Sequence, residues 1–358
     1  MLIALRGLQA AGGAGFTPSA TKIIVNYFGD ARDRAISLFG AIFSIGMMIG
    51  PIFGGLFVSY WTWRGIFLVN VPIGVAIVVL ALRYVPRDRS RLGGSPPRMD
   101  AIGMALLGGG LLTGMLAVSY LAESNAHDWS PEFVIPMAIA IVALWMFFRH
   151  INRSAYPFIA PRLIGGPGFG AINLINGLYG GVTSGVITLV PLYAWNRYGI
   201  NELHSGTLLI AQGVATIIFS IVGAFALRRT GYRLPMYAGG VVIAAGMLLL
   251  ALSPVAAVPP YVWLAGSALL IGTGRGANNP ASRNAGLQLA PEHSSTIAAL
   301  RTMSQQIGTI VTVSIDTTIL AGSDDPGVTQ AWLFALAAAL LVAALPLIAR
   351  VPEHRGSW

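Results

Sequence analysis

The sequence predicts an all-α polytopic membrane protein, and three observations support this fold class. Hydrophobic residues make up 55% of the 358-residue chain, whereas charged residues make up 10%. The mean hydropathy of +0.71 is too high for a water-soluble globular protein. Apolar stretches long enough to cross the ~30 Å hydrocarbon core of a bilayer recur along the whole chain. We therefore expect about 11 transmembrane helices.

The expected spans fall into groups of three, two and six. The first group belongs to a domain at 1–84, the pair to a linker region at 85–167, and the last six to a C-terminal domain at 168–358. Two loops rich in Arg, Gly and Pro, at 83–100 and 151–167, separate the groups. In chain order the expected spans are 1–27, 35–59, 65–84, 101–121, 133–149, 168–194, 205–227, 234–253, 260–282, 294–321 and 329–350.

Most arginines lie in alternate loops, on one side of the expected membrane topology. The loops of the other side hold only Arg64 and Arg197, together with acidic residues. This is the positive-inside pattern, so we expect a multi-pass protein of the inner (cytoplasmic) membrane with its C-terminus in the cytoplasm. The net charge of +9 then follows from topology, and nucleic acid is not an expected partner. The arginine-rich loops and the tail hold Arg32, Arg34, Arg83, Arg87, Arg89, Arg91, Arg98, Arg149, Arg153, Arg162, Arg228, Arg229, Arg233, Arg283 and Arg355.

The second expected span contains an unusual run of Gly and Pro. Each Gly inside a helix costs roughly 1 kcal/mol in water and a Pro costs about 3 kcal/mol, but in a bilayer the backbone must stay hydrogen-bonded. Glycines four residues apart let a second helix approach closely, and a proline bends the helix. We therefore expect this run to be a packing surface and hinge of a moving transporter. Its residues are Gly46, Gly50, Pro51, Gly54 and Gly55.

A weak internal repeat relates the first expected span to the ninth. Pro18 precedes Gly46 by 28 residues, and Pro280 precedes Gly308 by the same interval. Two spans in the same order and orientation suggest a parallel repeat, as in transporters built from two similar halves. If the second half has six spans, the first should have six as well. We therefore expect three spans to be missing upstream of the first.

These motifs resemble those of the major facilitator superfamily, and within it those of the fourteen-span drug:proton antiporters. Segment 46–55 resembles the family's antiporter motif, and segment 6–10 resembles its fourth-span motif, with Ala10 where glycine is usual. The pair of spans at 101–149 resembles the extra helices that turn twelve spans into fourteen. The resemblance implies a major facilitator fold without the family's first three spans. It also implies that Arg6 and Gln9 face a central cavity.

The chain departs from the family pattern at several positions. Ser37 stands where the antiporter motif has its leading glycine, and Gln305 stands where an arginine is expected, with Arg301 one turn earlier. In the gating loop, Arg228 replaces the family's Asp. These departures leave the fold prediction unchanged. The resemblance implies a cytoplasmic gating loop at Gly223, Arg229, Gly231 and Arg233.

Ionisable residues at membrane depth are functional candidates, because placing one there costs at least ~2.5–3.5 kcal/mol. Asp316 is the one carboxylate inside any expected span. It could bind and release a proton or pair with a cationic drug, or it could merely be wetted by an outer vestibule. Arg6 either faces the cavity or extends to the outer interface. We expect Arg301 to be an interface anchor.

Two groups of polar residues are further candidates for a substrate pathway. Arg275, Asn278 and Asn279 lie in the cytoplasmic half of the ninth span, where Arg275 could alternatively bind carbonyl groups at a helix break. A polar stripe at helical spacing in the sixth span faces either a cavity or the polar groups of another helix, and Gln212 could join it. The stripe consists of Asn173, Asn176, Tyr179 and Thr183.

Signatures of an enzyme, a metal site or a cofactor site are not expected. The chain has no cysteine, and its five histidines show no ligand spacing. The Gly-x-Gly-x-Gly segment at 272–276 follows no expected strand and therefore does not predict a dinucleotide-binding loop.

The sequence thus predicts proton-coupled efflux (antiport) of small amphipathic molecules or drugs by alternating access. The expected partners are the lipid bilayer, the small-molecule substrate and protons, and no periplasmic or outer-membrane adaptor can be identified from the sequence. A different hypothesis is a truncated, non-transporting fragment of such an antiporter. An uptake carrier is a third, which the Gly-Pro run disfavours.

Overall fold

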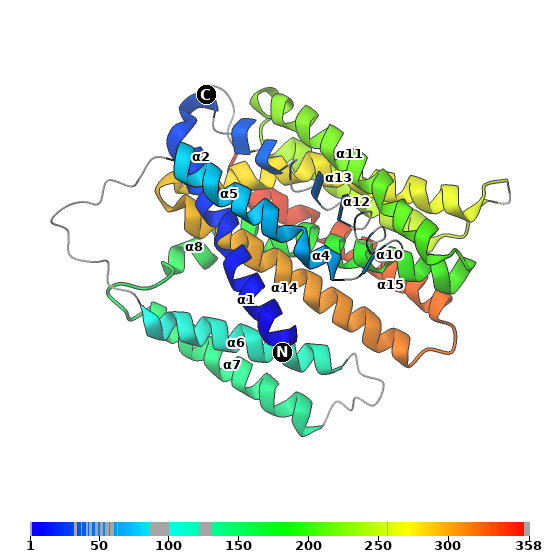
Figure 1. Cartoon of the computed structure of the whole chain (residues 1–358), viewed down its shortest axis with the longest axis horizontal. Helices are drawn as coiled ribbons and strands as arrows, with labels where there is room; N and C mark the ends of the chain where they lie inside the picture. The colour runs from blue at the N-terminus through cyan, green and yellow to red at the C-terminus, as the bar shows by residue number, and fades with distance from the viewer. Residues whose placement is uncertain are drawn as a thin grey trace.

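The structure is a computed structural model, and it is entirely helical over the residues that it describes. Most of its longer helices run roughly side by side along the long axis of the molecule (Figure 1). The described residues are 2–31, 34–36, 38–40, 42, 45–46, 49–50, 53, 57, 61–62, 64–85, 100–121, 130–255 and 257–353.

The N-terminal helices are largely exposed. α1 (Leu2–Ala14) and α2 (Phe16–Tyr27) occupy the first expected span and are followed by a 3-10 turn, η1 (Gly29–Ala31). α4 (Gly65–Leu68) and α5 (Asn70–Tyr84) occupy the third, and α5 contains no buried residue. Much of the second expected span, including Pro51, Gly54 and Gly55, lies outside the described residues.

Two antiparallel helices match the expected pair of extra spans (Figure 1). α6 (Ala101–Tyr120) agrees with the expected span 101–121. α7 (Pro131–Ile151) begins before the expected residue 133, because proline is well tolerated in the first helical turn. The hairpin packs against the side of a later helix, α14 (Ser294–Ala321).

A carboxylate outside the hairpin ties its ends together. The Asp100 side chain accepts hydrogen bonds from the backbone nitrogens of Gly103 at 2.8 Å and Phe158 at 2.9 Å. It also contacts His150 Nε2 at 2.8 Å. These bonds, with that from Gly103 first, hold the pKa of Asp100 below its ordinary value of 3.8.

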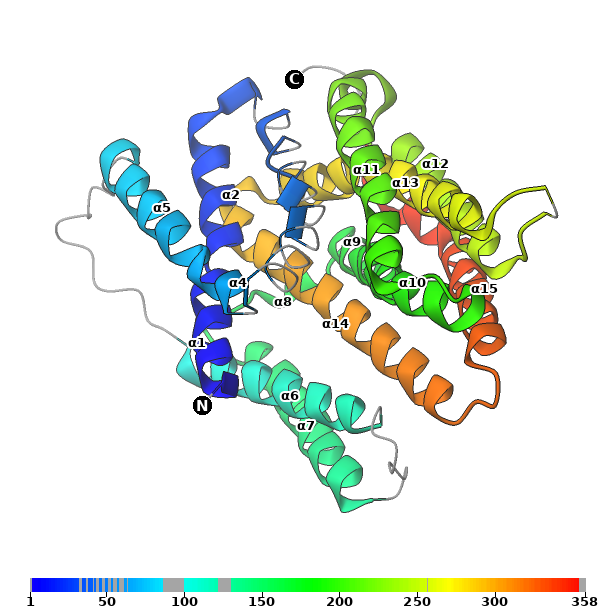
Figure 2. The ribbon, with the colours of Figure 1, turned by 45° about the vertical axis from the view of Figure 1, so that its right-hand side comes forward.

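The remaining helices form a bundle with two hydrophobic clusters. One extends from Ile172 to Val351, and the other includes Leu163, Phe169 and Leu300 together with residues of α6 and α7. Figure 2 shows α2 lying against α14 of this bundle. In chain order the bundle contains α8 (Pro161–Gly165), α9 (Phe169–Ile175), the π-helix η2 (Asn176–Val182), α10 (Thr183–Tyr198), α11 (Glu202–Thr230), α12 (Arg233–Ala251), α13 (Pro260–Leu289), η3 (Pro291–His293), α14, α15 (Pro326–Ala343) and η4 (Leu345–Arg350).

α13 is held between two other helices by its glycines. A Cβ atom at Gly272 would collide with the carbonyl group of Gln212 in α11, and one at Gly276 would lie 2.7 Å from the Cβ of Phe219. A Cβ atom at Gly274 would instead collide with α12. Residues four apart share a side of a helix, whereas the residue between them lies on another side. The Gly-x-Gly-x-Gly segment is therefore a helix-packing motif.

The extent of α13 corrects one expectation from the sequence. The helix continues past residue 282, because residues such as Ala285 and Leu287 remain buried. Arg283 therefore lies within a helix and not in a cytoplasmic loop. Its Nη1 donates a hydrogen bond to the carbonyl oxygen of Ile36 at 3.3 Å, and its guanidinium group lies 5.5 Å from the ring centroid of Phe39. Arg283 thus connects the bundle to the N-terminal part of the chain.

Within the described residues, six helical segments are long and apolar enough to cross a membrane. α13 and α14 have 30 and 28 residues, which is also sufficient length, but both carry more polar side chains. The chain is thus a multi-pass membrane protein, whereas about 11 spans remains a prediction.

Candidate functional site

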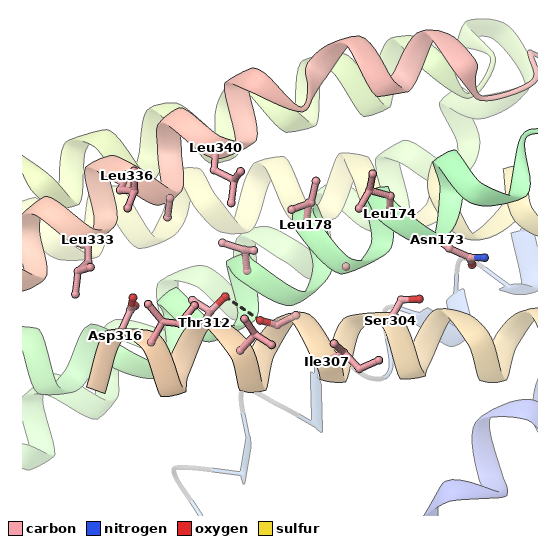
Figure 3. Close-up of a pocket in the computed structure, with 16 residues that line it drawn as sticks. Asn173, Leu174, Leu178, Ser304, Ile307, Thr312, Asp316, Leu333, Leu336 and Leu340 are labelled. Atoms are coloured by element: carbon pink, nitrogen blue, oxygen red, sulfur yellow. Dashed lines mark hydrogen bonds between the residues drawn. The ribbon is translucent and has the colours of Figure 1, made fainter. Parts of the chain in front are cut away.

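A groove of about 470 Å³ lies between η2, α14 and α15 (Figure 3). Its walls are mainly apolar, with Leu178 on one side and Leu336 on another. Figure 3 shows Asp316 at one end of the groove and Asn173 and Ser304 at the other. The groove therefore combines an apolar middle with polar ends.

Asp316 forms part of the groove wall near the end of α14. Its residue surface is 6% exposed. Among the described residues, no side chain donates a hydrogen bond to its carboxylate group. This carboxylate could exchange a proton or hold a cation without breaking a structural hydrogen bond.

Arg301 is buried inside the bundle, contrary to its expected place as an interface anchor. It is 9% exposed. Its Nε donates a hydrogen bond to Asn176 Oδ1 at 3.2 Å, and its Nη2 donates one to Asn279 Oδ1 at 3.3 Å. The physical reason is that α2, α9 and α13 cover the first turns of α14.

Arg275 is the second buried arginine, at 8% exposure. Its Nη2 donates a hydrogen bond to Ser184 Oγ at 3.1 Å, whereas its Nε and Nη1 have no acceptor among the described residues. α13 is unbroken here, so the alternative role at a helix break is wrong. The neighbouring Asn278 lies on the side of α13 that faces Gly239 of α12, and its Oδ1 has no donor in the same described part.

The polar stripe of the sixth expected span does not stay on one side. Asn173 lines the groove and donates to two carbonyl groups of α8, both at 3.0 Å. Asn176 accepts from Arg301, whereas the Tyr179 hydroxyl group donates to the Leu341 carbonyl oxygen in α15. The cause is η2, because a π-helix has i→i+5 hydrogen bonds and changes the period on which the stripe was based.

Gln212 does not join the stripe. It lies on the contact between α11 and α13, where its Nε2 donates to Thr216 Oγ1 at 2.9 Å. The Thr216 hydroxyl group also lies 3.1 Å from the carbonyl oxygen of Gly272. Gln212 therefore belongs to helix packing in this conformation.

Four predicted residues of the N-terminal region lie in α1 or in the second expected span. Arg6 and Gln9 are in α1, whereas the described residues that line the groove belong to later helices. An added Cβ atom at Gly46 or Gly50 would meet no atom within 4 Å in the described part of the chain. The expected tight packing of these glycines therefore stays a prediction.

The predicted gating loop lies at the turn between α11 and α12. Gly223 and the exposed Arg229 are in α11. Gly231 ends α11 with φ +71°, a conformation that favours glycine. Arg233 Nε donates to the Val351 carbonyl oxygen at 2.7 Å, so this turn is tied to the C-terminal segment.

Sequence interpretation missed Arg301 and Ser184 as candidates. A signal for Arg301 existed, because the residue lies well inside the span that starts at Ser294. No such signal existed for Ser184, because a serine in an apolar helix commonly bonds its own backbone, as this one also does with Gly180.

Comparison with known proteins agrees with this architecture. A family model described as Major Facilitator Superfamily matches residues 1–313. The chain is 30% identical over 250 residues to the multidrug transporter protein MdtP of Bacillus subtilis, which covers 70% of this chain and 46% of that relative. It is 29% identical over 369 residues to the cephamycin export protein CmcT of Amycolatopsis lactamdurans, covering 98% of this chain and 74% of the relative.

A third relative is the methylenomycin A resistance protein of Streptomyces coelicolor, at 29% identity over 370 residues. This match covers 99% of this chain and 74% of that protein. With a family model that matches most of an all-helical chain, and with these transport proteins among its relatives, the chain belongs to the Major Facilitator Superfamily, a family of transporters and not of enzymes.

Proposed function

We propose that this protein exports small amphipathic, drug-like molecules by alternating access. The observation that carries the proposal is the groove between η2, α14 and α15. Its volume of about 470 Å³ is within the usual range for small-molecule sites, about 300–1,000 Å³. Its apolar walls and polar ends suit an amphipathic molecule. The name of one relative, a multidrug transporter, supports drug-like substrates, and the name of another, a cephamycin export protein, supports export over uptake.

We propose further that export is antiport driven by the proton gradient, with Asp316 as the proton-binding group. Asp316 is buried at the edge of the groove, so a bound substrate and a bound proton would influence each other there. Placing an ionisable group at membrane depth costs free energy, so a group found there usually has a function. The free-energy cost of keeping the ionised Asp316 carboxylate buried would couple its protonation to the conformational change.

Vesicle transport tests this function. Inverted membrane vesicles that contain the full chain should accumulate a panel of fluorescent amphipathic compounds when a proton gradient is imposed. Asp316→Asn should lower gradient-driven accumulation at least tenfold, because the side chain can no longer release a proton. Asp324→Asn is the matched control, since Asp324 is exposed near the same end of α14.

The outcomes separate the hypotheses. Normal accumulation by Asp316→Asn would exclude Asp316 as the coupling group while leaving export intact. If the unaltered chain transports none of the panel, the alternative of a non-transporting fragment is favoured.

The fourteen-span subtype, the three additional N-terminal spans, the cytoplasmic C-terminus and the inner-membrane location belong to the same proposal. The intact mass of the protein from its native membrane tests the additional spans. A mass larger than 37.6 kDa by roughly 10 kDa would support them, because three helices of about 20 residues and their loops have about that mass. A mass near 37.6 kDa would contradict them.

A further inference from the structure

We propose that Arg275 and Arg301, with Arg283 beside them, bind the anionic group of an amphipathic substrate whose apolar body occupies the groove. The inference rests on the proposed export function and specifies its substrate class. The anionic group is a carboxylate, sulfonate or phosphate, all of which present oxygen acceptors to a guanidinium group.

The charges of Arg275 and Arg301 have no acidic partner among the described residues. Arg275 and Arg301 are both buried, and their hydrogen-bond partners are the neutral side chains of Ser184, Asn176 and Asn279. The ion pairs found among the described residues involve other side chains. A buried charge without an opposite charge is strongly unfavourable. The pair is therefore a strained arrangement that an anion would relieve.

The guanidinium group of Arg275 has hydrogen-bond donors that find no acceptor in the described part of the chain. Nε and Nη1 of Arg275 are both buried and have no acceptor within the described chain. A guanidinium group has five N–H donors and no acceptor, so only an acceptor can satisfy it. Nearly all buried polar groups in folded proteins have a partner. These two nitrogens thus point to a ligand oxygen.

The arginines have defined positions along α13 and α14 relative to the groove. Arg275, Asn279 and Arg283 lie at four-residue spacing, and therefore along one side of α13. Arg301 lies one turn before Ser304, which lines the groove. Along α14, Arg301 and Asp316 are about 22 Å apart at 1.5 Å per residue. Arg301 thus lies one turn beyond the Ser304 end of the groove and Asp316 lies at the opposite end, whereas neither Arg275 nor Arg301 is among the described residues that line it.

The arginines are closed off in this conformation. Arg283 and Arg301 both line two small cavities, of about 20 Å³ and about 10 Å³, and each has room for about one water molecule. Thr17 and Thr21 of α2 line the larger one, and Asn173 lines the smaller one and the groove. Movement of α2 away from α14 would open the arginines to a ligand, and alternating access provides such a movement.

A matched pair of probes tests the proposal. The anion is 4-(pyren-1-yl)butyrate and the cation is 4-(pyren-1-yl)butyltrimethylammonium, which share the apolar body. Binding to the purified full chain is followed by energy transfer from tryptophan to pyrene. The unaltered protein should bind the anion at least tenfold more tightly. Arg301→Gln and Arg275→Gln should each weaken anion binding at least tenfold and leave cation binding unchanged. The control is Arg149→Gln, an exposed arginine of α7.

A second measurement separates ligand binding from a structural role. If Arg275 serves only to hold helices together, Arg275→Gln should lower the thermal unfolding midpoint of the ligand-free protein. If Arg275 instead binds an anion that is absent from the ligand-free protein, Arg275→Gln should leave that midpoint unchanged or raise it. The reason is that the substitution removes an unsatisfied buried charge. The same preparation shows whether the variant is folded.

Each outcome decides the matter. Unchanged anion binding by both glutamine variants, tighter binding of the cation by the unaltered protein, or a lowered midpoint for ligand-free Arg275→Gln would overturn the proposal. If the cation is bound and exported while the anion is not, the anion site is wrong and the export function stands. If neither probe is bound or exported, and no compound of the vesicle panel is transported, both fail.

Discussion

At the scale of single residues, Asp100 shows how one carboxylate can organise a helix hairpin. Asp100→Ala should expose the amide groups of Gly103 and Phe158, because both donate to its carboxylate. The pKa of Asp100 is lowered in the folded protein, so its stabilising effect is present above its ordinary pKa of 3.8 and is lost as pH falls through the lower folded value. Hydrogen exchange of the variant relative to the unaltered protein, compared at each pH, measures this effect.

The expected exchange ratio is constant above about pH 4 and approaches one below that, since both proteins then lack the charge. Asp100→Asn is the control, because asparagine also caps helices well and should retain protection at Gly103. Equal protection of these amides in Asp100→Ala and the unaltered protein at neutral pH would contradict the interpretation.

The same scale shows what the sequence could predict about the site. Asp316 was identified from the cost of charge at membrane depth and Arg275 from its place in the cytoplasmic half of the ninth expected span, and the structure places both in the interior. The position of Arg301 inside the span that starts at Ser294 marked it as a candidate, but its burial could not be predicted from the local sequence. It depends on α2 and α13, which are distant in sequence and cover that turn. Local pattern carries no information about such a contact.

At the scale of secondary-structure elements, α13 depends on small residues on two sides. Gly272→Ala should destabilise the protein by about 1–3 kcal/mol, because its Cβ would collide with the Gln212 carbonyl group and separate α11 from α13. Gly266→Ala in the same helix is the control, since no atom of the described residues lies within 4 Å of its added Cβ. It should be neutral or stabilising by up to about 1 kcal/mol, as alanine favours helix. Thermal unfolding in detergent compares the two variants. A Gly272→Ala midpoint equal to that of Gly266→Ala would exclude tight packing there.

The helices also show where a prediction based on a single helical period is wrong. α14 agrees with the expected span 294–321 over its whole length. The span 168–194 does not form one regular helix, because it contains η2. A tertiary contact accompanies this change, since Gly181 and Gly308 approach closely enough that a Cβ atom at either would overlap the other chain segment. A pattern based on 3.6 residues per turn cannot detect a π-helix, so the stripe was assigned to one side.

At the scale of the whole molecule, the Gly-Pro run distinguishes folding from movement. In the described part of the chain, an added Cβ atom at Gly50 meets only open space. Gly50→Leu should therefore insert normally in the membrane. If the run packs against another helix during alternating access, the larger side chain should lower export at least tenfold, because overlapping side chains would block the approach.

The control is Gly12→Leu in α1, where an added Cβ atom also meets open space but no hinge is predicted. Protein level in the membrane and export in inverted vesicles are measured for both variants. Loss of export with normal insertion in Gly50→Leu alone would support a packing surface used in another conformation. Export retained by Gly50→Leu would exclude the hinge, whereas failed insertion would mean that Gly50 is packed already in the resting fold. The measurement thus tests a contact that belongs to the transport cycle. It requires a compound that is exported, but not knowledge of the natural substrate's chemical identity.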